Sequence, residues 1–284
     1  MRRQDRGGPT PLEPGPDRSM RIAWLTDIHL EFLSHGEVDA FFERLLVEDP
    51  EAVLVGGDTG TATTFSRFLS RMEERLQRPI YFVLGNHDFY GGSIGEVRRV
   101  AAALGARSRW LRWLPDAGVV PLTNRTGLMG HGSWADGRLG SGAGSNVLLN
   151  DYLQIRDFVA LGHQERFQKL NELGDEAAAS VEALLPAAAE RFDDLLFLTH
   201  VPPFREAAWH EGQASADDWL PHFSCRAVGD VLVRVMAAHP GCSLTVLCGH
   251  THGEGEVRLL KNLLVRTAGA EYGKPRIRML TDVR

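Results

Sequence analysis

The stretch FVLGNHDFYGG, residues 82–92, joins a short apolar run to a turn that carries Asn86, His87 and Asp88 ahead of a glycine pair. The run before the turn has the length and composition of a buried strand. Amide, imidazole and carboxylate groups in one turn can bind a metal, transfer a proton or cap the next helix. These uses stay open until the rest of the chain is considered.

Four further apolar runs of strand length end in the same way, with polar residues able to bind a metal. They are RIAWLT (21–26), AVLVGG (52–57), DLLFLTH (194–200) and SLTVLCGH (243–250). Amphipathic helix patterns at 37–48, 63–77 and 226–238 stand between runs. The alternation predicts an α/β fold whose first three strands are parallel and buried. Because ligands bind beyond the carboxyl ends of such strands, the polar residues there are expected to converge.

Residues 107–192 are less regular. The stretch GLMGHGSWADGRLGSGAG (127–144) is predicted to be a glycine-rich loop, and the alanine-rich stretch 175–192 a helix. Residues 254–269 and 275–280 are predicted to be closing antiparallel strands, with a turn at Lys261 and Asn262. We expect a flexible leader over residues 1–19 and a single domain over 20–284, with an inserted cap at about 131–175.

Composition narrows the class of protein. The 284 residues carry a formal net charge of -6, which gives no general attraction to nucleic acid. Three cysteines are a poor disulfide framework, so a reducing cytoplasmic location is the simpler expectation. The sequence holds no apolar run of about 18 residues, so no membrane span is expected.

Five short motifs stand at the five strand ends: DIH, GGD, GNHD, TH and GHTH. Each one alone is a weak signal, because a histidine or aspartate after a strand is more often a packing or capping residue. Together they supply carboxylates, imidazoles and a carboxamide without a thiolate, which suits manganese, iron or zinc. In this order they resemble the motifs of the calcineurin-like metallophosphoesterase superfamily, over about residues 20–270.

The resemblance implies a four-layer α/β/β/α sandwich with mixed sheets and an irregular inserted cap. It also implies two divalent metal ions, with manganese favoured and iron, zinc or nickel open. The first ion would be held by Asp27, His29 and His252, and the second by Asn86, His200 and His250. Asp58 would bridge the ions, one carboxylate oxygen to each.

The implied chemistry is attack at phosphorus by a metal-bridging hydroxide. His87 would be a catalytic group that stabilises the transition state or protonates the leaving oxygen. Asp88 would be catalytic by orienting His87, or it would cap the helical pattern that follows. Loop residues His131, Asp136 and Trp134 are weaker candidates for substrate contact.

The GNHD motif also narrows the class of substrate that the resemblance implies. Related protein serine/threonine phosphatases have glutamate at the place of Asp88 and an arginine close behind, whereas the first arginine here is Arg98. This favours a phosphodiesterase or phosphomonoesterase acting on a small or nucleotide-like substrate. A nuclease of the same superfamily and a protein-interaction scaffold are the alternatives, and the scaffold is less favoured because every ligand position is filled. The oligomeric state is not constrained.

Overall fold

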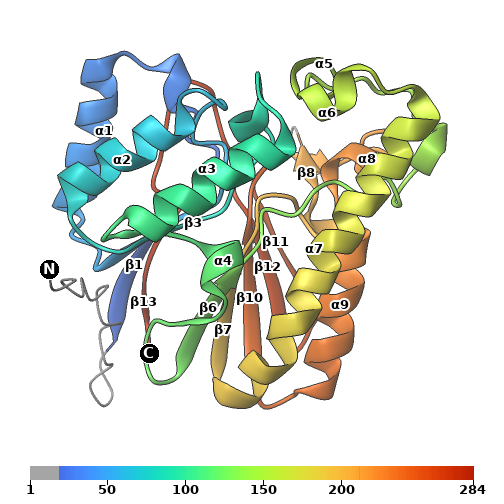
Figure 1. The fold of residues 1–284 in the computed structure, drawn as a ribbon. Helices are drawn as coiled ribbons and strands as arrows, with labels where there is room; N and C mark the ends of the chain where they lie inside the picture. The colour runs from blue at the N-terminus through green and yellow to red at the C-terminus, as the bar shows by residue number, and fades with distance from the viewer. Residues whose placement is uncertain (1–18, 211) are drawn as a thin grey trace, which may run out of the picture.

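The computed structural model describes residues 19–210 and 212–284. The leader predicted for residues 1–19 lies outside the described residues, apart from Ser19. Within the described part, two large β-sheets pack face to face and helices cover their outer surfaces (Figure 1). This is the expected four-layer sandwich.

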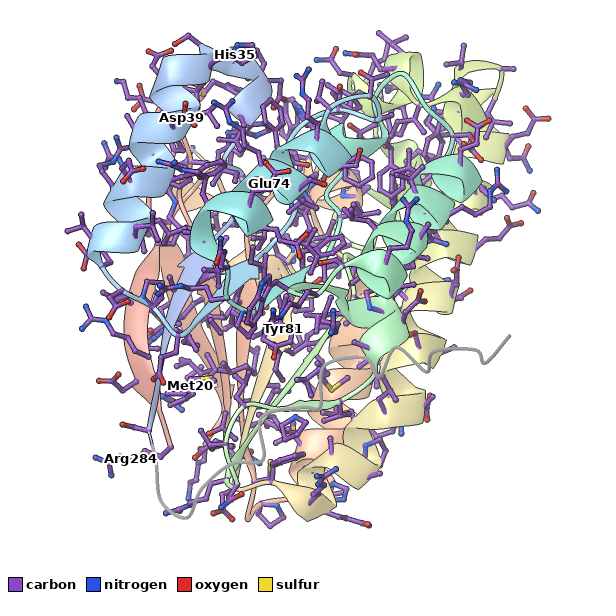
Figure 2. The ribbon with its side chains drawn as sticks, turned by 60° about the vertical axis from the view of Figure 1, so that its left-hand side comes forward. Met20, His35, Asp39, Glu74, Tyr81 and Arg284 are labelled. Atoms are coloured by element: carbon purple, nitrogen blue, oxygen red, sulfur yellow. The ribbon has the colours of Figure 1, made fainter. Side chains whose placement is uncertain are left out.

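The first sheet has five strands in the order β13-β1-β2-β3-β4. Their bounds are β1 Met20–Leu25, β2 Ala52–Val55, β3 Ile80–Phe82, β4 Leu111–Trp113 and β13 Met279–Val283. Strands β1 to β4 are parallel, as predicted for the first three, and β13 runs antiparallel to β1. Met20 and Arg284 therefore lie at the same end of this sheet (Figure 2).

The second sheet has six strands in the order β11-β12-β10-β7-β6-β5. Their bounds are β5 Val120–Pro121, β6 Thr126–Gly130, β7 Asp194–Leu198, β10 Ser243–Cys248, β11 Gly255–Leu260 and β12 Leu263–Thr267. Strands β6, β7, β10 and β12 are parallel. The predicted turn at Lys261 and Asn262 joins the antiparallel pair β11 and β12. Strands β8 (Trp209–His210) and β9 (Gln213–Ala214) form a separate small ribbon.

The helices divide between the two outer faces. Helices α1 (His35–Val47), α2 (Phe65–Leu76) and α3 (Ile94–Arg107) cover the first sheet, and α7 (His163–Arg191) and α9 (Arg226–Ala238) cover the second (Figure 1). Four short helices complete the set: α4 Leu114–Ala117, α5 Asp151–Gln154, α6 Arg156–Val159 and α8 Leu220–Phe223. No helix in the described ranges combines the length and the apolar character needed to cross a bilayer.

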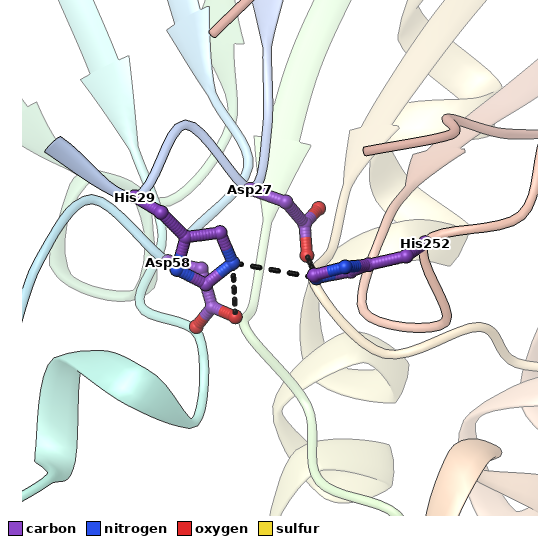
Figure 3. Close-up of side chains that lie close together, drawn as sticks. All are labelled: Asp27, His29, Asp58 and His252. Atoms are coloured by element: carbon purple, nitrogen blue, oxygen red, sulfur yellow. Dashed lines mark hydrogen bonds and ion pairs between the residues drawn. The ribbon is translucent and has the colours of Figure 1, made fainter. Parts of the chain in front are cut away.

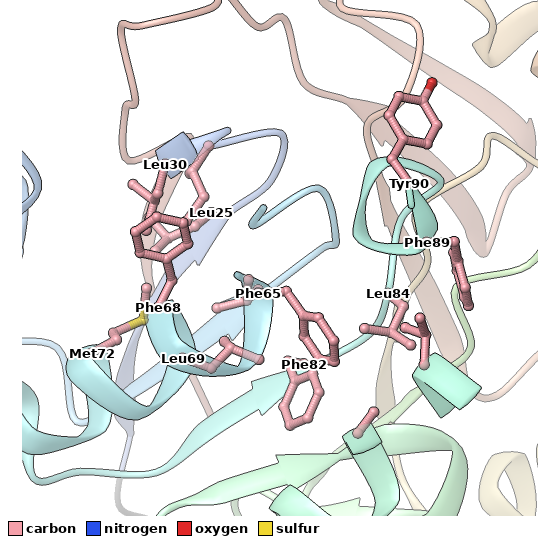
Figure 4. Close-up of a cluster of buried hydrophobic side chains, with 14 of the residues drawn as sticks. Leu25, Leu30, Phe65, Phe68, Leu69, Met72, Phe82, Leu84, Phe89 and Tyr90 are labelled. Atoms are coloured by element: carbon pink, nitrogen blue, oxygen red, sulfur yellow. The ribbon is translucent and has the colours of Figure 1, made fainter. Parts of the chain in front are cut away.

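The alternation of side chains along β1 explains the layers. Ala23 and Leu25 pack with the helices of the first sheet, in a core that includes the aromatic residues of α2 (Figure 4). Ile22 and Trp24 point the other way, into the core between the sheets. A strand buried on both faces is continuously apolar, which is why RIAWLT was recognisable.

The middle of the chain corrects one prediction. The stretch that begins GLMG was expected to be a loop, but Thr126–Gly130 is the fully buried strand β6, paired with β7. Its two glycines conceal the strand pattern, because glycine is rare inside strands except at close contacts. The alanine-rich helix is also longer than predicted and begins at His163.

We predict that Gly130→Ala destabilises the protein by about 1–3 kcal/mol, the usual cost of overpacking a core. A Cβ at Gly130 would lie 2.7 Å from the carbonyl oxygen of Leu198, which is backbone and cannot easily move. Gly144→Ala is the control, because a Cβ there meets nothing within 4 Å. Urea unfolding of both variants is the measurement, and equal midpoints would contradict the account of β6.

Candidate metal centre

The predicted ligands leave the two sheets at the same edge of the sandwich. Asp27 and His29 follow β1, Asp58 follows β2 and Asn86 follows β3, all from the first sheet. The second sheet contributes the loops after β7 and β10, which carry His200, His250 and His252. The expected convergence is therefore observed, and it joins two sheets rather than the ends of one.

The backbone at this edge adopts conformations that only glycine adopts easily. Eight non-glycine residues in the described ranges have a positive φ, and five of them are predicted ligands: Asp27 (50°), His29 (42°), Asp58 (51°), His250 (70°) and His252 (58°). A left-handed residue costs roughly 1–2 kcal/mol. Such conformations gather where function requires a side chain to be aimed.

Glycine allows two of the ligand loops to touch. Gly57 has a φ of 93°, and a Cβ there would lie 2.5 Å from the backbone nitrogen of Gly85. The loops after β2 and β3 thus pass in contact, which brings Asp58 close to Asn86. Any other residue at Gly57 would separate them.

The first cluster comprises Asp27, His29, Asp58 and His252, whose ligand atoms all lie within 4.8 Å of one another (Figure 3). Nε2 of His29 lies 3.3 Å from Nε2 of His252 and 3.7 Å from Oδ2 of Asp58. Nε2 of His252 lies 3.4 Å from Oδ1 of Asp27. Two imidazole nitrogens and two carboxylates therefore face one small volume.

The second cluster is centred on the carboxamide oxygen of Asn86. Oδ1 lies 2.9 Å from Nε2 of His200 and 3.0 Å from Nδ1 of His250. The other nitrogen of each ring lies 3.0 Å from a carbonyl oxygen, that of Gly56 for His200 and that of His222 for His250. A neutral imidazole carries one proton, so each ring can donate to only one of its two oxygen neighbours. With the proton on the outer nitrogen, the inner nitrogen presents a lone pair.

The orientation of the Asn86 carboxamide decides which of its atoms faces the two histidines. Its Nδ2 donates to Oδ1 of Asp151 at 2.8 Å, so its Oδ1 is the atom that faces the histidines. With the outer ring nitrogens protonated, the oxygen lone pair faces two nitrogen lone pairs with no proton between them. A cation satisfies all three at once, so this donor set fits a divalent ion.

The pKa values of the buried side chains favour a bound cation at this edge of the sandwich. Burial lowers the pKa of His200 and of His250 to about 4, which keeps both rings neutral near pH 7. Burial and the charges of Asp27 and Asp88 raise the pKa of Asp58 well above its usual range. An ionised Asp58 therefore needs a positive charge that the neutral imidazoles do not supply.

Asp58 stands between the clusters, as its predicted bridging role requires. Its Oδ2 faces both sides, at 3.7 Å from Nε2 of His29 and 3.5 Å from Nε2 of His200. Its Oδ1 accepts the backbone N–H of His87 at 2.9 Å. Asp58 is therefore the carboxylate that both clusters would share, and its predicted bridging role stays a prediction.

The hydrogen-bond partners of the Asp88 carboxylate differ from those predicted. Its fully buried carboxylate accepts four backbone N–H groups, at 2.9–3.0 Å, from Gly85 and from residues 58–60. Within the described ranges it makes no hydrogen bond to the ring of His87, and helix α3 is capped by Ser93 instead. The capping prediction is therefore wrong, whereas the role of Asp88 in orienting His87 stays a prediction. The contacts that the carboxylate does make tie the loops after β2 and β3 together.

His87 lies beside the first cluster with its ring partly exposed. The ring stacks on Tyr90 with centroids 4.2 Å apart and meets the edge of His29 at 4.6 Å. The carboxylate nearest to its Nδ1 is Glu31, with Oε1 at 3.8 Å. Glu31 was not a sequence candidate, although its place two residues after His29 was a signal that could have found it.

Helix α5 contributes a buried carboxylate to the second cluster. Oδ1 of Asp151 accepts from both Nδ2 of Asn86 and the hydroxyl of Tyr90, at 2.8 and 2.7 Å. Sequence reasoning missed Asp151, because no local motif marks a residue 65 positions away from its partner. Asp151 therefore helps to aim a predicted metal ligand.

The weaker loop candidates have structural partners. Asp136 is fully buried and accepts the backbone N–H of Ala227, and Trp134 packs against Phe89 in the core. Nδ1 of His131 accepts the backbone N–H of Ser133. The exposed aromatic rings beside the ligands are Tyr272 and Phe32, whose centroids lie 5.0 Å apart, with Tyr272 4.5 Å from His29.

We predict that Asp151→Ala weakens binding of one metal ion about 10- to 100-fold, the usual cost of removing a group that orients a ligand. Without Asp151, Nδ2 of Asn86 loses its charged acceptor and keeps the hydroxyl of Tyr90 at 3.3 Å, so the carboxamide is held less firmly. Gln154→Ala is the matched control, since Gln154 lies in the same short helix with an exposed side chain. Titration of the metal-free proteins with Mn²⁺ by calorimetry tests this, and equal affinities for the two variants would refute it.

Solved structures share the fold. A dimetal phosphatase from Danio rerio aligns with a TM-score of 0.56 at 15% identity, over 88% of this chain and 87% of that one. Phosphopantetheinyl hydrolase (PptH) from Mycobacterium tuberculosis aligns with a TM-score of 0.59 at 14% identity, over 92% and 95%. No curated protein matches the sequence.

The sequence also matches the family model for calcineurin-like phosphoesterases over residues 20–254. The matched range contains every predicted ligand and both buried clusters. With its fold and its paired clusters of metal-binding side chains, the chain belongs to the calcineurin-like phosphoesterase family.

Proposed function

We propose that this phosphoesterase uses two divalent ions to hydrolyse a small or nucleotide-like phosphoester. The observation that carries the proposal is the meeting of two imidazole nitrogens with the carboxamide oxygen of Asn86, next to a carboxylate whose Oδ2 faces both clusters. Asp27, His29 and His252 would hold one ion, with Asn86, His200 and His250 holding the other and Asp58 shared. Manganese is the expected metal, and iron, zinc and nickel suit the same donors.

Bound there, two ions would supply Lewis-acid polarisation of the phosphoryl oxygens and a water of lowered pKa for attack at phosphorus. The chain itself aims the groups around that reaction. Backbone carbonyls of Gly56 and His222 hold His200 and His250 in the tautomers that expose a lone pair. Asp88 fixes the loops that carry Asp58 and Asn86.

His87 is the residue that we assign to the leaving group. Its ring is held by Tyr90 on one face and stays partly open to solvent. An imidazole can protonate a leaving oxygen near neutral pH or hydrogen-bond a phosphoryl oxygen in the transition state. Its backbone is fixed by the bond to Asp58, so the ring keeps its place beside the first cluster.

Two exposed aromatic rings support a small organic substrate. Phe32 is 57% exposed and Tyr272 is 48% exposed, and both stand next to His29 at the rim of the site. Exposed rings at a polar site offer a face on which a planar group can stack.

A nuclease is less favoured, because the net charge of -6 gives no general attraction to a nucleic acid. A cytoplasmic location stays a prediction.

We expect the chelated protein to be inactive and to regain activity with Mn²⁺. The assay compares bis(4-nitrophenyl) phosphate with 4-nitrophenyl phosphate, which separates diester from monoester hydrolysis. Turnover of at least one substrate only when metal is restored is the predicted outcome. Protein that binds two ions and still hydrolyses neither would contradict the proposal and favour the protein-interaction scaffold.

His87→Ala and Asp58→Ala are predicted to fail in different ways. His87→Ala should keep both metal ions and lose about 10²- to 10⁴-fold in turnover, the range for a proton-transfer group. Asp58→Ala should lose metal as well, because its carboxylate is the group shared by both clusters. Metal content by mass spectrometry, measured beside the rate, separates the two. If His87→Ala were the variant that lost metal, the division of roles would be wrong.

A further inference from the structure

Glu31 lies between two histidines that have different roles in the proposed function. It belongs to the short 3₁₀ turn Leu30–Phe32 that follows His29, and its side chain is only 14% exposed. Its Oε1 lies 3.4 Å from Nδ1 of His29 and 3.8 Å from Nδ1 of His87. One carboxylate oxygen thus faces the outer nitrogen of a predicted metal ligand and a nitrogen of the predicted acid.

The turn that carries Glu31 is firmly attached to the loop after β2. The backbone N–H of His29 donates to the carbonyl of Asp58, and that of Leu30 donates to the carbonyl of Thr59. The nearby helix α1 is capped by Ser34 and Glu37, so Glu31 is not needed for capping. Its Oε2 is buried without a hydrogen-bond partner among the described residues. Local structure therefore gives no reason for a partly buried carboxylate here.

The contact with His29 fits the role of a carboxylate behind a metal-binding imidazole. Nε2 of His29 faces the first cluster, so Nδ1 is the nitrogen left to donate to Glu31. Such a bond fixes the tautomer and the ring angle of the ligand. The contact with His87 is longer than a hydrogen bond, and contacts of this kind often tighten only when substrate is bound.

We propose that Glu31 is a shared positioning residue, which holds His29 for the first metal ion and His87 for the leaving group. With Nδ1 of His87 directed at Glu31, Nε2 is the nitrogen free to serve the leaving oxygen. As the oxygen of the attacking water bonds to phosphorus and the bond from phosphorus to the leaving oxygen breaks, the leaving oxygen takes the Nε2 proton of the doubly protonated ring. The ring is then neutral and keeps its proton on Nδ1. The inference rests on the proposed function, and its test separates the two.

The first test compares Glu31→Gln with Glu74→Gln, an exposed glutamate on the outer helix α2 (Figure 2). The substrates are two phosphoesters of the class that the wild type hydrolyses, one with a 4-nitrophenyl and one with a phenyl leaving group. A nitrophenolate needs no proton to leave, whereas a phenolate does. We expect Glu31→Gln to slow the first less than about threefold and the second about 10- to 100-fold. Glu74→Gln should change neither.

The second test asks whether Glu31 acts through His87. In a His87→Ala background, Glu31→Gln should no longer alter the ratio of the two rates, because the residue that it positions is gone. Equal slowing of both substrates, unchanged by His87→Ala, would overturn the proposal and leave Glu31 a merely structural residue.

The third test needs no turnover. In the metal-free protein, long-range ¹H–¹⁵N spectra should show Nδ1 of both His29 and His87 protonated in the wild type, with that preference lost in Glu31→Gln. The affinity of the first cluster for Mn²⁺ should fall about 10- to 100-fold in the same variant. Unchanged tautomers with unchanged affinity would refute the proposal.

A third bound ion would also overturn it, because His29, Glu31 and His87 are close enough to form a metal site of their own. In that case the wild type would bind three Mn²⁺ and Glu31→Gln two. A wild type that binds two ions but hydrolyses nothing counts against the proposed function alone. The role of Glu31 is then tested by the tautomers of His29 and His87 and by the affinity for Mn²⁺.

Discussion

The rest of the site depends on a crowding of electron lone pairs at the edge that the two sheets share. The carboxamide oxygen of Asn86 lies 2.9–3.0 Å from two imidazole nitrogens, a distance at which hydrogen bonds normally form. Each neutral ring has one proton and a second acceptor, a backbone carbonyl, at its other nitrogen, so it cannot donate to both oxygens. A divalent cation would satisfy the carboxamide oxygen and both imidazole nitrogens at once, and the chain holds these atoms in place.

This constraint explains where the protein places its strain and its buried charge. Left-handed backbone at five ligands, each costing roughly 1–2 kcal/mol, persists because the surrounding loops are fixed. Asp88 fixes two of them with four backbone hydrogen bonds, and Asp151 of helix α5 holds Asn86. Bound metal would stabilise the folded chain by an amount that grows with the logarithm of its affinity, so the strained loops and the ions support each other.

The sequence was sufficient wherever a pattern is local. Buried parallel strands are continuously apolar, and the polar residues after them are adjacent in sequence, so RIAWLT and the GNHD turn were both recognisable. Strand β6 was missed because Gly127 and Gly130 interrupt its apolar pattern, and the reason for those glycines lies in neighbours distant in sequence. Asp151 was missed for the same reason. The backbone contacts of Asp88 were not predicted, because adjacency to His87 says nothing about where a side chain points.

The central claim is that side chains from the ends of both sheets hold two ions with Asp58 between them. Anomalous diffraction at the manganese edge, from crystals of the chelated protein reloaded with Mn²⁺, tests it most directly. The account predicts two peaks about 3.5–4 Å apart, the usual spacing of paired metal ions, with one beside His29 and His252 and the other beside Asn86 and His250. A single peak at this edge, or manganese bound only elsewhere on the chain, would contradict it.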